Sequence, residues 1–138
     1  MYLVGVLFVV AGAYWRVVCF RHLGRFFTFE LSVQKDHELI TDGPYAVVRH
    51  PGYGAALMQV IGLVLCLTSA GSWWAESGMW YTRVGKIVSL IVGAHVALCI
   101  VGGVDRTFKE DEKMKQMFKE EWAEWAKKTR YRLVPYIF

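Results

Sequence analysis

A turn-rich segment that combines histidine, arginine and tyrosine side chains stands directly before a long apolar run. It covers residues 37–45 and 48–53 and includes Pro44 and Pro51. Imidazole, phenol and guanidinium groups can bind polar or charged ligands, and the Gly43-Pro44 pair predicts a turn that would present them. Such a combination of groups, placed where the chain enters a membrane, is an unlikely spacer and a plausible ligand site. We therefore interpret this segment as a candidate ligand site.

Pro51 marks the junction between this segment and the apolar run. Proline disfavours helix at the preceding residue, His50, and suits the first turn of a helix. The N–H groups at such a helix start have no partner within the helix, so they can meet a polar or anionic ligand. For His50, anchoring at the membrane interface beside Arg49 and Tyr53 is an equally good structural explanation.

A second pair of candidate residues lies just after the third apolar run. Arg106 and Glu110 are four residues apart, so on a helix they project from one face, which Asp111 and Glu112 do not share. Taken alone, the pair is explained by an ordinary surface ion pair worth about 0.3–0.5 kcal/mol. A position at the same membrane face as the histidine-rich segment favours a site that includes both.

Three apolar runs must position these groups, at about residues 2–20, 53–70 and 84–104. Each approaches the roughly 20 residues that cross a bilayer, and an apolar content of 55% is high for a soluble domain. The first run lacks the basic start and the cleavage site of a signal peptide. We expect an all-α integral membrane protein in which residues 1–138 form a single domain with about three transmembrane helices.

The distribution of basic residues predicts the orientation of these spans. The loop between the first two runs carries Arg21, Arg25, Lys35 and Arg49. Nine more basic residues follow from Arg106 to Arg132, both included. The connection between the second and third runs offers only Arg83, with Lys86 just beyond. The positive-inside rule therefore places the first loop and the tail, residues 105–138, together in the cytosol.

The tail contains an amphipathic pattern from Arg106 to about Lys128. Its apolar residues recur at three- and four-residue steps, namely Phe108, Met114, Phe118, Trp122 and Trp125. This stripe predicts a cytosolic helix that lies on the membrane surface or caps the other helices. Its lysines alternate with acidic residues, which argues against a nucleic-acid partner. Pro135 predicts that the last residues leave the helix, and glycines in the second and third runs predict close helix packing.

Several common kinds of site are not predicted. The three cysteines fall one in each apolar run, so neither a disulfide framework nor a metal cluster is expected. The sequence has no glycine-rich phosphate loop and no Rossmann fingerprint. The residues alone therefore predict a cytosol-facing site of His, Tyr, Arg and Glu without naming a reaction.

Residues 24–138 resemble the isoprenylcysteine carboxyl methyltransferase family, whose members are membrane enzymes that use S-adenosylmethionine without a Rossmann domain. The matching motifs are His37-Glu38-Leu39-Ile40, Gly43-Pro44-Tyr45, Arg49-His50-Pro51-Gly52-Tyr53, Arg106 with Glu110-Asp111, and Phe118 through Trp122 and Trp125 to Arg132-Leu133-Val134-Pro135. The acidic pair of the family usually reads Glu-Glu and here reads Glu-Asp.

The resemblance implies a role for each matched residue. The cofactor S-adenosylmethionine would be bound by His37, Glu38, Leu39, Ile40, Tyr45, His50, Pro51, Gly52, Tyr53 and Glu110, with Gln34 as a looser match. Arg106 would face the substrate carboxylate as the catalytic residue. The implied reaction forms a methyl ester on the C-terminal prenylcysteine of farnesylated or geranylgeranylated proteins, at the endoplasmic reticulum. Membrane lipid is a further implied partner, and self-association stays open.

Three alternatives share part of this pattern. A phospholipid N-methyltransferase has similar Gly-Pro-Tyr and Arg-His-Pro motifs, but its amine acceptor would be a poor partner for Arg106. A sterol reductase, which uses NADPH, resembles the Arg-His-Pro motif and the closing residues 131–138. The third alternative is a membrane scaffold or an inactive, truncated relative, because members of the family usually have further N-terminal spans.

Overall fold

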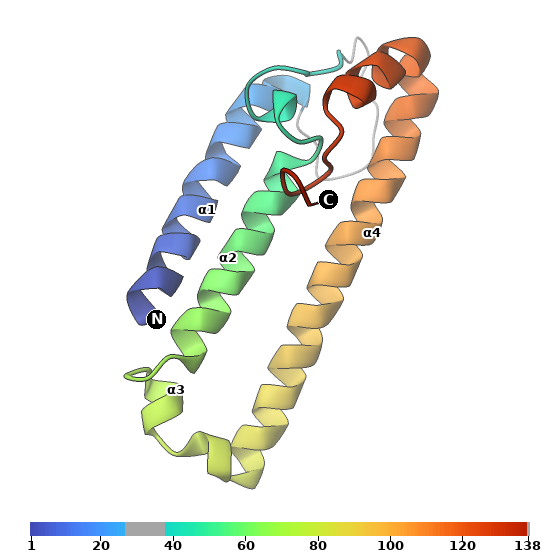
Figure 1. Cartoon of the computed structure of the whole chain (residues 1–138). Coiled ribbons are helices and arrows are strands. Elements are labelled where there is room, and N and C mark those ends of the chain that lie inside the picture. Colours follow the sequence, from blue (N-terminus) through green and yellow to red (C-terminus); the bar gives the residue numbers. More distant parts are fainter. Residues whose placement is uncertain (27–37, 138) are drawn as a thin grey trace. The chain divides into compact units, whose positions relative to one another are not determined.

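The computed structural model describes residues 1–26 and 38–137. Every regular element of these residues is helical, and none is a strand (Figure 1). The α-helices are α1 (Tyr2–Leu23), α2 (Pro51–Thr68), α3 (Trp73–Glu76) and α4 (Arg83–Lys128), and the short 3-10 helices are η1 (Gly24–Phe26), η2 (Gly43–Ala46) and η3 (Met79–Tyr81). The predicted all-α class is confirmed.

In the described part of the chain, three helical segments are long and apolar enough to cross a membrane. They are Tyr2–Phe26, Pro51–Glu76 and Arg83–Lys128, with mean hydropathies of 2.1, 1.8 and 2.4 over their most apolar windows. The three predicted spans are therefore confirmed by length and composition. The second helix begins at Pro51, where the proline predicts its first turn.

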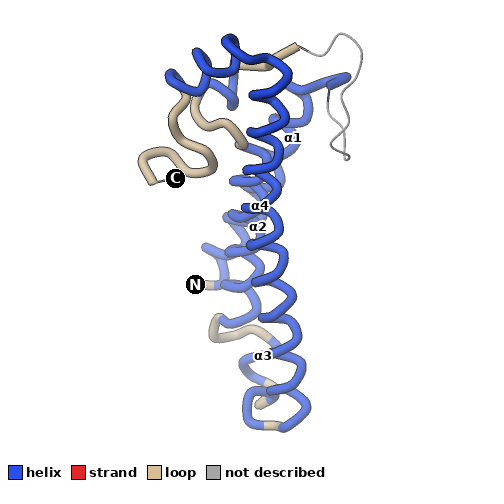
Figure 2. The backbone as a smooth tube through the Cα atoms, turned by 90° about the vertical axis from the view of Figure 1, so that its right-hand side faces the viewer, coloured by secondary structure: helices blue, strands red, loops and turns tan. Residues whose placement is uncertain are grey.

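The third apolar run and the amphipathic stretch both belong to α4. A change from apolar to polar side chains does not end a helix, and residues 104–118 contain neither proline nor glycine. The break in α4 falls instead at Lys119, where φ is 44° and ψ is −109°. Figure 2 shows the last turns of α4 folding back before the C-terminal loop.

The chain divides into two compact units, and the first comprises Met1–Tyr14 and Ala55–Gly103. Here α1 and α2 approach closely at glycines: a Cβ atom on Gly62 would lie 2.6 Å from the Gly5 carbonyl oxygen. A Cβ on Gly93 would have no neighbour within 4 Å. Predicted close packing is thus confirmed at Gly62 and does not extend to Gly93 of α4.

The second unit comprises Trp15–Gly54 and Val104–Phe138. Its core contains the buried side chains of Cys19, Leu39, Tyr45 and Trp125, against which Leu23, Ile40, Met114, Phe118 and Trp122 pack. The indole N–H of Trp125 donates a hydrogen bond of 3.2 Å to the backbone carbonyl of Tyr45. The apolar stripe of α4 therefore covers the segment around Leu39 and Tyr45. Of the two predicted positions for this stripe, on the membrane surface or as a cap on the other helices, the structure favours the cap.

Candidate functional site

The turn that leads into α2 is held by the C-terminal segment. The backbone N–H of Arg49 donates to the carbonyl of Tyr131 over 2.9 Å, and that of His50 donates to Arg132 over 2.8 Å. Farther along, a Cβ on Gly54 would lie 2.8 Å from the carbonyl oxygen of Leu133. These contacts use backbone atoms of a segment far away in sequence, so no side-chain pattern predicts them.

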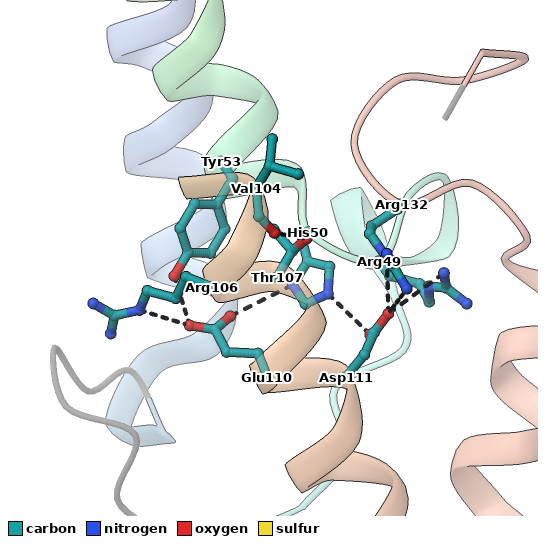
Figure 3. A network of polar contacts seen from close by, with 9 residues as sticks. All are labelled: Arg49, His50, Tyr53, Val104, Arg106, Thr107, Glu110, Asp111 and Arg132. Carbon is teal, nitrogen blue, oxygen red and sulfur yellow. Dashed lines mark hydrogen bonds and ion pairs between the residues drawn. The ribbon is translucent and has the colours of Figure 1, made fainter. Parts of the chain in front are cut away.

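Glu110 of α4 is the centre of one group of contacts (Figure 3). The hydroxyl of Tyr53 donates to its Oε1 over 2.6 Å, and Nε of Arg106 donates to the same oxygen over 3.1 Å. Nδ1 of His50 lies 3.5 Å from Oε2. The structure thus brings together four of the residues that the sequence analysis assigns to the site.

Exposure distinguishes the two members of the Arg106–Glu110 pair. The Arg106 side chain is 41% exposed and the Glu110 side chain 23% exposed. The guanidinium is therefore the member more accessible to a large substrate, and the carboxylate lies deeper.

Asp111 is the centre of a second group of contacts, which Figure 3 shows on the other side of His50. Nε2 of His50 lies 2.9 Å from Oδ1 of Asp111. Nε and Nη2 of Arg132 each lie 3.0 Å from Oδ2, and Nη2 of Arg49 lies 3.4 Å from that oxygen. Sequence reasoning assigned Asp111 no role, although its place in an acidic pair was an available signal.

His50 is buried between these two carboxylates. Burial lowers the pKa of an imidazole, but the hydrogen bonds and charges of Asp111 and Glu110 outweigh it, and the pKa of His50 is raised above its usual value. The imidazolium is the form with a donor on each ring nitrogen. The geometry therefore favours a positively charged His50.

The remaining predicted site residues fall into three groups. The side chains of Leu39, Ile40 and Tyr45 belong to the core of the second unit, and Pro51 is buried as well. Gly52 is partly buried and Glu38 is exposed. His37 and Gln34 lie outside the described residues. A cofactor role for any of these residues stays a prediction.

Two buried donors beside the Asp111 group have no hydrogen-bond partner in the described part of the chain. They are Nε of Arg49 and Nε1 of Trp122, and the Arg49 guanidinium carbon lies 5.9 Å from the centre of the Trp122 ring. Among the described residues, no group of three or more His, Cys, Asp or Glu side chains could hold a metal ion. The site is thus a charged, partly buried set of hydrogen-bonding groups.

Comparisons with known proteins give the family. A model of the isoprenylcysteine carboxyl methyltransferase family matches residues 4–76, which is more than half of the chain. Two curated proteins named "Probable protein-S-isoprenylcysteine O-methyltransferase", from Oryza sativa subsp. indica and subsp. japonica, are each 36% identical over 67 residues. These residues are 46% of this chain and 35% of each relative, so the chain spans about a third of the relatives' length. No solved structure matches the chain significantly. By the family match, the chain belongs to the isoprenylcysteine carboxyl methyltransferase family.

Proposed function

We propose that this chain uses S-adenosylmethionine to methylate the C-terminal carboxylate of prenylated proteins, with residues 1–138 as one catalytic membrane domain. One observation carries the proposal: Arg106, Glu110 and Tyr53 are joined by hydrogen bonds in a member of this family. The three groups offer a cation for a carboxylate substrate and an anion for a cationic cofactor.

The donors and acceptors present fit S-adenosylmethionine. Its ammonium group and ribose hydroxyls are hydrogen-bond donors, and the carboxylate of Glu110 is an acceptor that would repel a carboxylate substrate. A carboxylate has about four acceptor positions, and Tyr53, Arg106 and His50 face Glu110. A cofactor must therefore share Glu110 with these groups or displace one of them. When bound, the cofactor supplies an electrophilic methyl group.

We assign the rest of the cofactor pocket to the segments that match the family motifs. These are His37, Glu38, Leu39 and Ile40, then Tyr45, and then His50, Pro51, Gly52 and Tyr53, with Gln34 as the least certain match. Because Leu39 and Tyr45 pack in the core, their part in the pocket would be to fix the backbone around it.

Arg106 is the residue that we assign to the substrate. A C-terminal α-carboxyl group has an ordinary pKa of about 3.5, so it is ionised at neutral pH and needs no general base. It needs orientation, which a guanidinium supplies through two parallel hydrogen bonds. Methyl transfer from a sulfonium to a carboxylate cancels two opposite charges, so a site with little water does not oppose the step.

The apolar helices support a membrane-bound substrate. A farnesyl or geranylgeranyl chain is soluble in the hydrocarbon of a bilayer, where three segments of this protein are apolar enough to lie. The basic first loop and tail favour a cytosolic site, where the protein part of the substrate would remain. We assign the enzyme to the endoplasmic reticulum by family membership.

The proposal is tested with membranes that contain the chain, S-adenosylmethionine labelled at the methyl group, and N-acetyl-S-farnesylcysteine. We expect a base-labile methyl ester that is absent with the Arg106→Ala variant. Label that appears instead in phosphatidylethanolamine would favour a phospholipid N-methyltransferase and overturn the proposal. Absence of ester would also overturn it for this chain; retained binding of S-adenosylhomocysteine would then identify an inactive relative.

A further inference from the structure

His50 has one oxygen of each carboxylate to itself among the described residues. Oδ2 of Asp111 is taken by Arg49 and Arg132, whereas His50 Nε2 faces Oδ1. On the other side, Oε1 of Glu110 is taken by Tyr53 and Arg106, whereas His50 Nδ1 faces Oε2.

The two ring nitrogens of His50 therefore both meet negatively charged oxygens. A neutral imidazole has one N–H donor and one lone pair, so one nitrogen would direct its lone pair at a carboxylate. The imidazolium donates from both nitrogens, and charge-assisted hydrogen bonds of this kind are the stronger ones. His50 is thus suited to act as a fixed cation and poorly suited to accept a proton.

Asp111 is itself held in place from two directions. Arg49 precedes His50 in the turn before α2, and Arg132 belongs to the C-terminal segment whose backbone pairs with that turn. With its Oδ2 bound by both guanidinium groups, the carboxylate presents Oδ1 to His50. The side chain of Asp111 is only 8% exposed, so water competes little for these contacts.

We propose that Asp111 is a positioning residue that keeps His50 as an imidazolium directed at Glu110. The importance of Asp111 for turnover rests on the proposed function, in which Glu110 holds the cofactor. A charged His50 keeps the Glu110 carboxylate ionised and oriented, which leaves it ready to bind the ammonium or ribose hydroxyls. In this proposal Asp111 affects the cofactor through His50 and makes no contact with substrate or cofactor itself.

The charged groups around His50 in the described residues all enter this assignment. From α4 these are Glu110, Asp111 and Arg106, from the preceding turn Arg49, and from the C-terminal segment Arg132. The ring of Tyr53 on α2 lies edge-on, with its centre 6.0 Å from that of His50. The positive charges of the arginines disfavour protonation of His50. However, the arginines bind Oδ2 of Asp111 and Oε1 of Glu110, whereas the imidazole faces Oδ1 and Oε2.

The test is an NMR titration of labelled histidine in the full chain, reconstituted in lipid nanodiscs, with His50→Gln to assign the signal. The reference is the ordinary histidine pKa of about 6.5. In the unmodified protein we expect His50 to titrate above this value. A titration at or below it would overturn the proposal, and this comparison needs no other variant.

Asp111→Asn keeps the shape of the side chain and removes its charge. We expect it to lower the titration midpoint of His50 by about one to two pH units, since a charge-assisted hydrogen bond is lost. The matched control is Asp105→Asn on the same helix, where the exposed carboxylate pairs with Lys109. An equal shift in the two variants would overturn the proposal, because the effect would then be one of net charge alone.

Cofactor affinity gives a second readout. Binding of S-adenosylhomocysteine should weaken above the titration midpoint of His50. In Asp111→Asn the loss of affinity should begin at a lower pH, by the same number of pH units as the NMR midpoint moves. Asp111→Glu should return the affinity profile part of the way to that of the unmodified protein. If the NMR shift occurs and the binding profile does not move, the link to Glu110 is wrong. The NMR result is independent of turnover, so failure of the proposed function would be recognised separately.

Discussion

Tyr53 and Glu110 are joined by a hydrogen bond of 2.6 Å between the phenol hydroxyl and Oε1 of the carboxylate. The bond connects the first turn of α2 to residue 110 of α4. Both residues belong to the second unit. Arg106 donates to the same oxygen. Tyr53 and Arg106 thus share one acceptor atom, Oε1 of Glu110.

Replacement of Glu110 by alanine should weaken cofactor binding itself. The change removes the carboxylate that we assign to the ammonium group or ribose hydroxyls of the cofactor. A hydrogen bond to a charged group contributes about 1.5–3 kcal/mol, which corresponds to roughly a tenfold to hundredfold higher Kd. Titration calorimetry with S-adenosylhomocysteine measures this Kd. Glu112→Ala, which removes an exposed carboxylate that contacts Gln116, should leave the Kd unchanged, and equal losses would contradict a specific role for Glu110.

Replacement of Arg106 by alanine should separate binding from turnover. The variant loses the cation that orients the substrate, and misplacement of a reacting group can cost about 100-fold in rate. Binding of S-adenosylhomocysteine should persist because Glu110 loses a competitor for Oε1. Methyl transfer to N-acetyl-S-farnesylcysteine and cofactor Kd are measured together, with Lys109→Ala as the control for a lost positive charge. Unchanged turnover in the Arg106 variant would refute its assignment.

The raised pKa of His50 makes stability depend on pH in a defined direction. Asp111 and Glu110 hold the pKa of the folded state above the unfolded value of about 6.5. The stabilising contribution is therefore complete below that unfolded value and is lost as the pH rises through the folded pKa.

Thermal unfolding of the protein in detergent, followed by circular dichroism between about pH 6 and about pH 9, measures this loss. His50→Gln removes the titrating group, so its unfolding temperature should decline less over the same interval. Parallel curves for the two proteins would show that His50 does not carry the dependence.

Gly62 and Gly93 should respond differently to the same added methyl group. A Cβ on Gly62 would meet the Gly5 carbonyl oxygen and the Val9 backbone nitrogen, so Gly62→Ala must push α1 and α2 apart at a cost of about 1–3 kcal/mol. Gly93→Ala meets nothing within 4 Å and should stabilise its helix by up to about 1 kcal/mol. The free energy of unfolding of both variants, measured under identical conditions, tests the close approach of α1 and α2 at Gly62. A similar change in the two variants would contradict it.

Lys119 offers a test of the break in α4. A positive φ is unfavourable for a residue with a Cβ atom and tolerated by glycine, and Lys119 has φ of 44°. Lys119→Gly should therefore stabilise the protein by about 1 kcal/mol. The control Lys115→Gly lies in regular helix and should destabilise it by about 1 kcal/mol. Destabilisation by both would mean that α4 continues unbroken through Lys119.

Much of the architecture follows from local chemistry. The lengths of the apolar runs predict three spans because a helix must satisfy its backbone polar groups within the bilayer. Pro51 predicts the start of α2, because its ring excludes helix before it and permits helix after it. The spacing of Arg106 and Glu110 predicts their ion pair, since residues four apart share one face of a helix.

The sequence did not reveal the break within α4, the contacts of Asp111 or the core positions of Leu39 and Tyr45. The break at Lys119 comes just before Trp122 and Trp125, which pack in the core of the second unit. The pattern of polar and apolar residues does not contain that information. By itself, then, the sequence determined the helices, their membrane character and the residue types of the site. Only the tertiary structure decided that His50 lies between two carboxylates, because that arrangement depends on contacts among α4, the turn before α2 and the C-terminal segment.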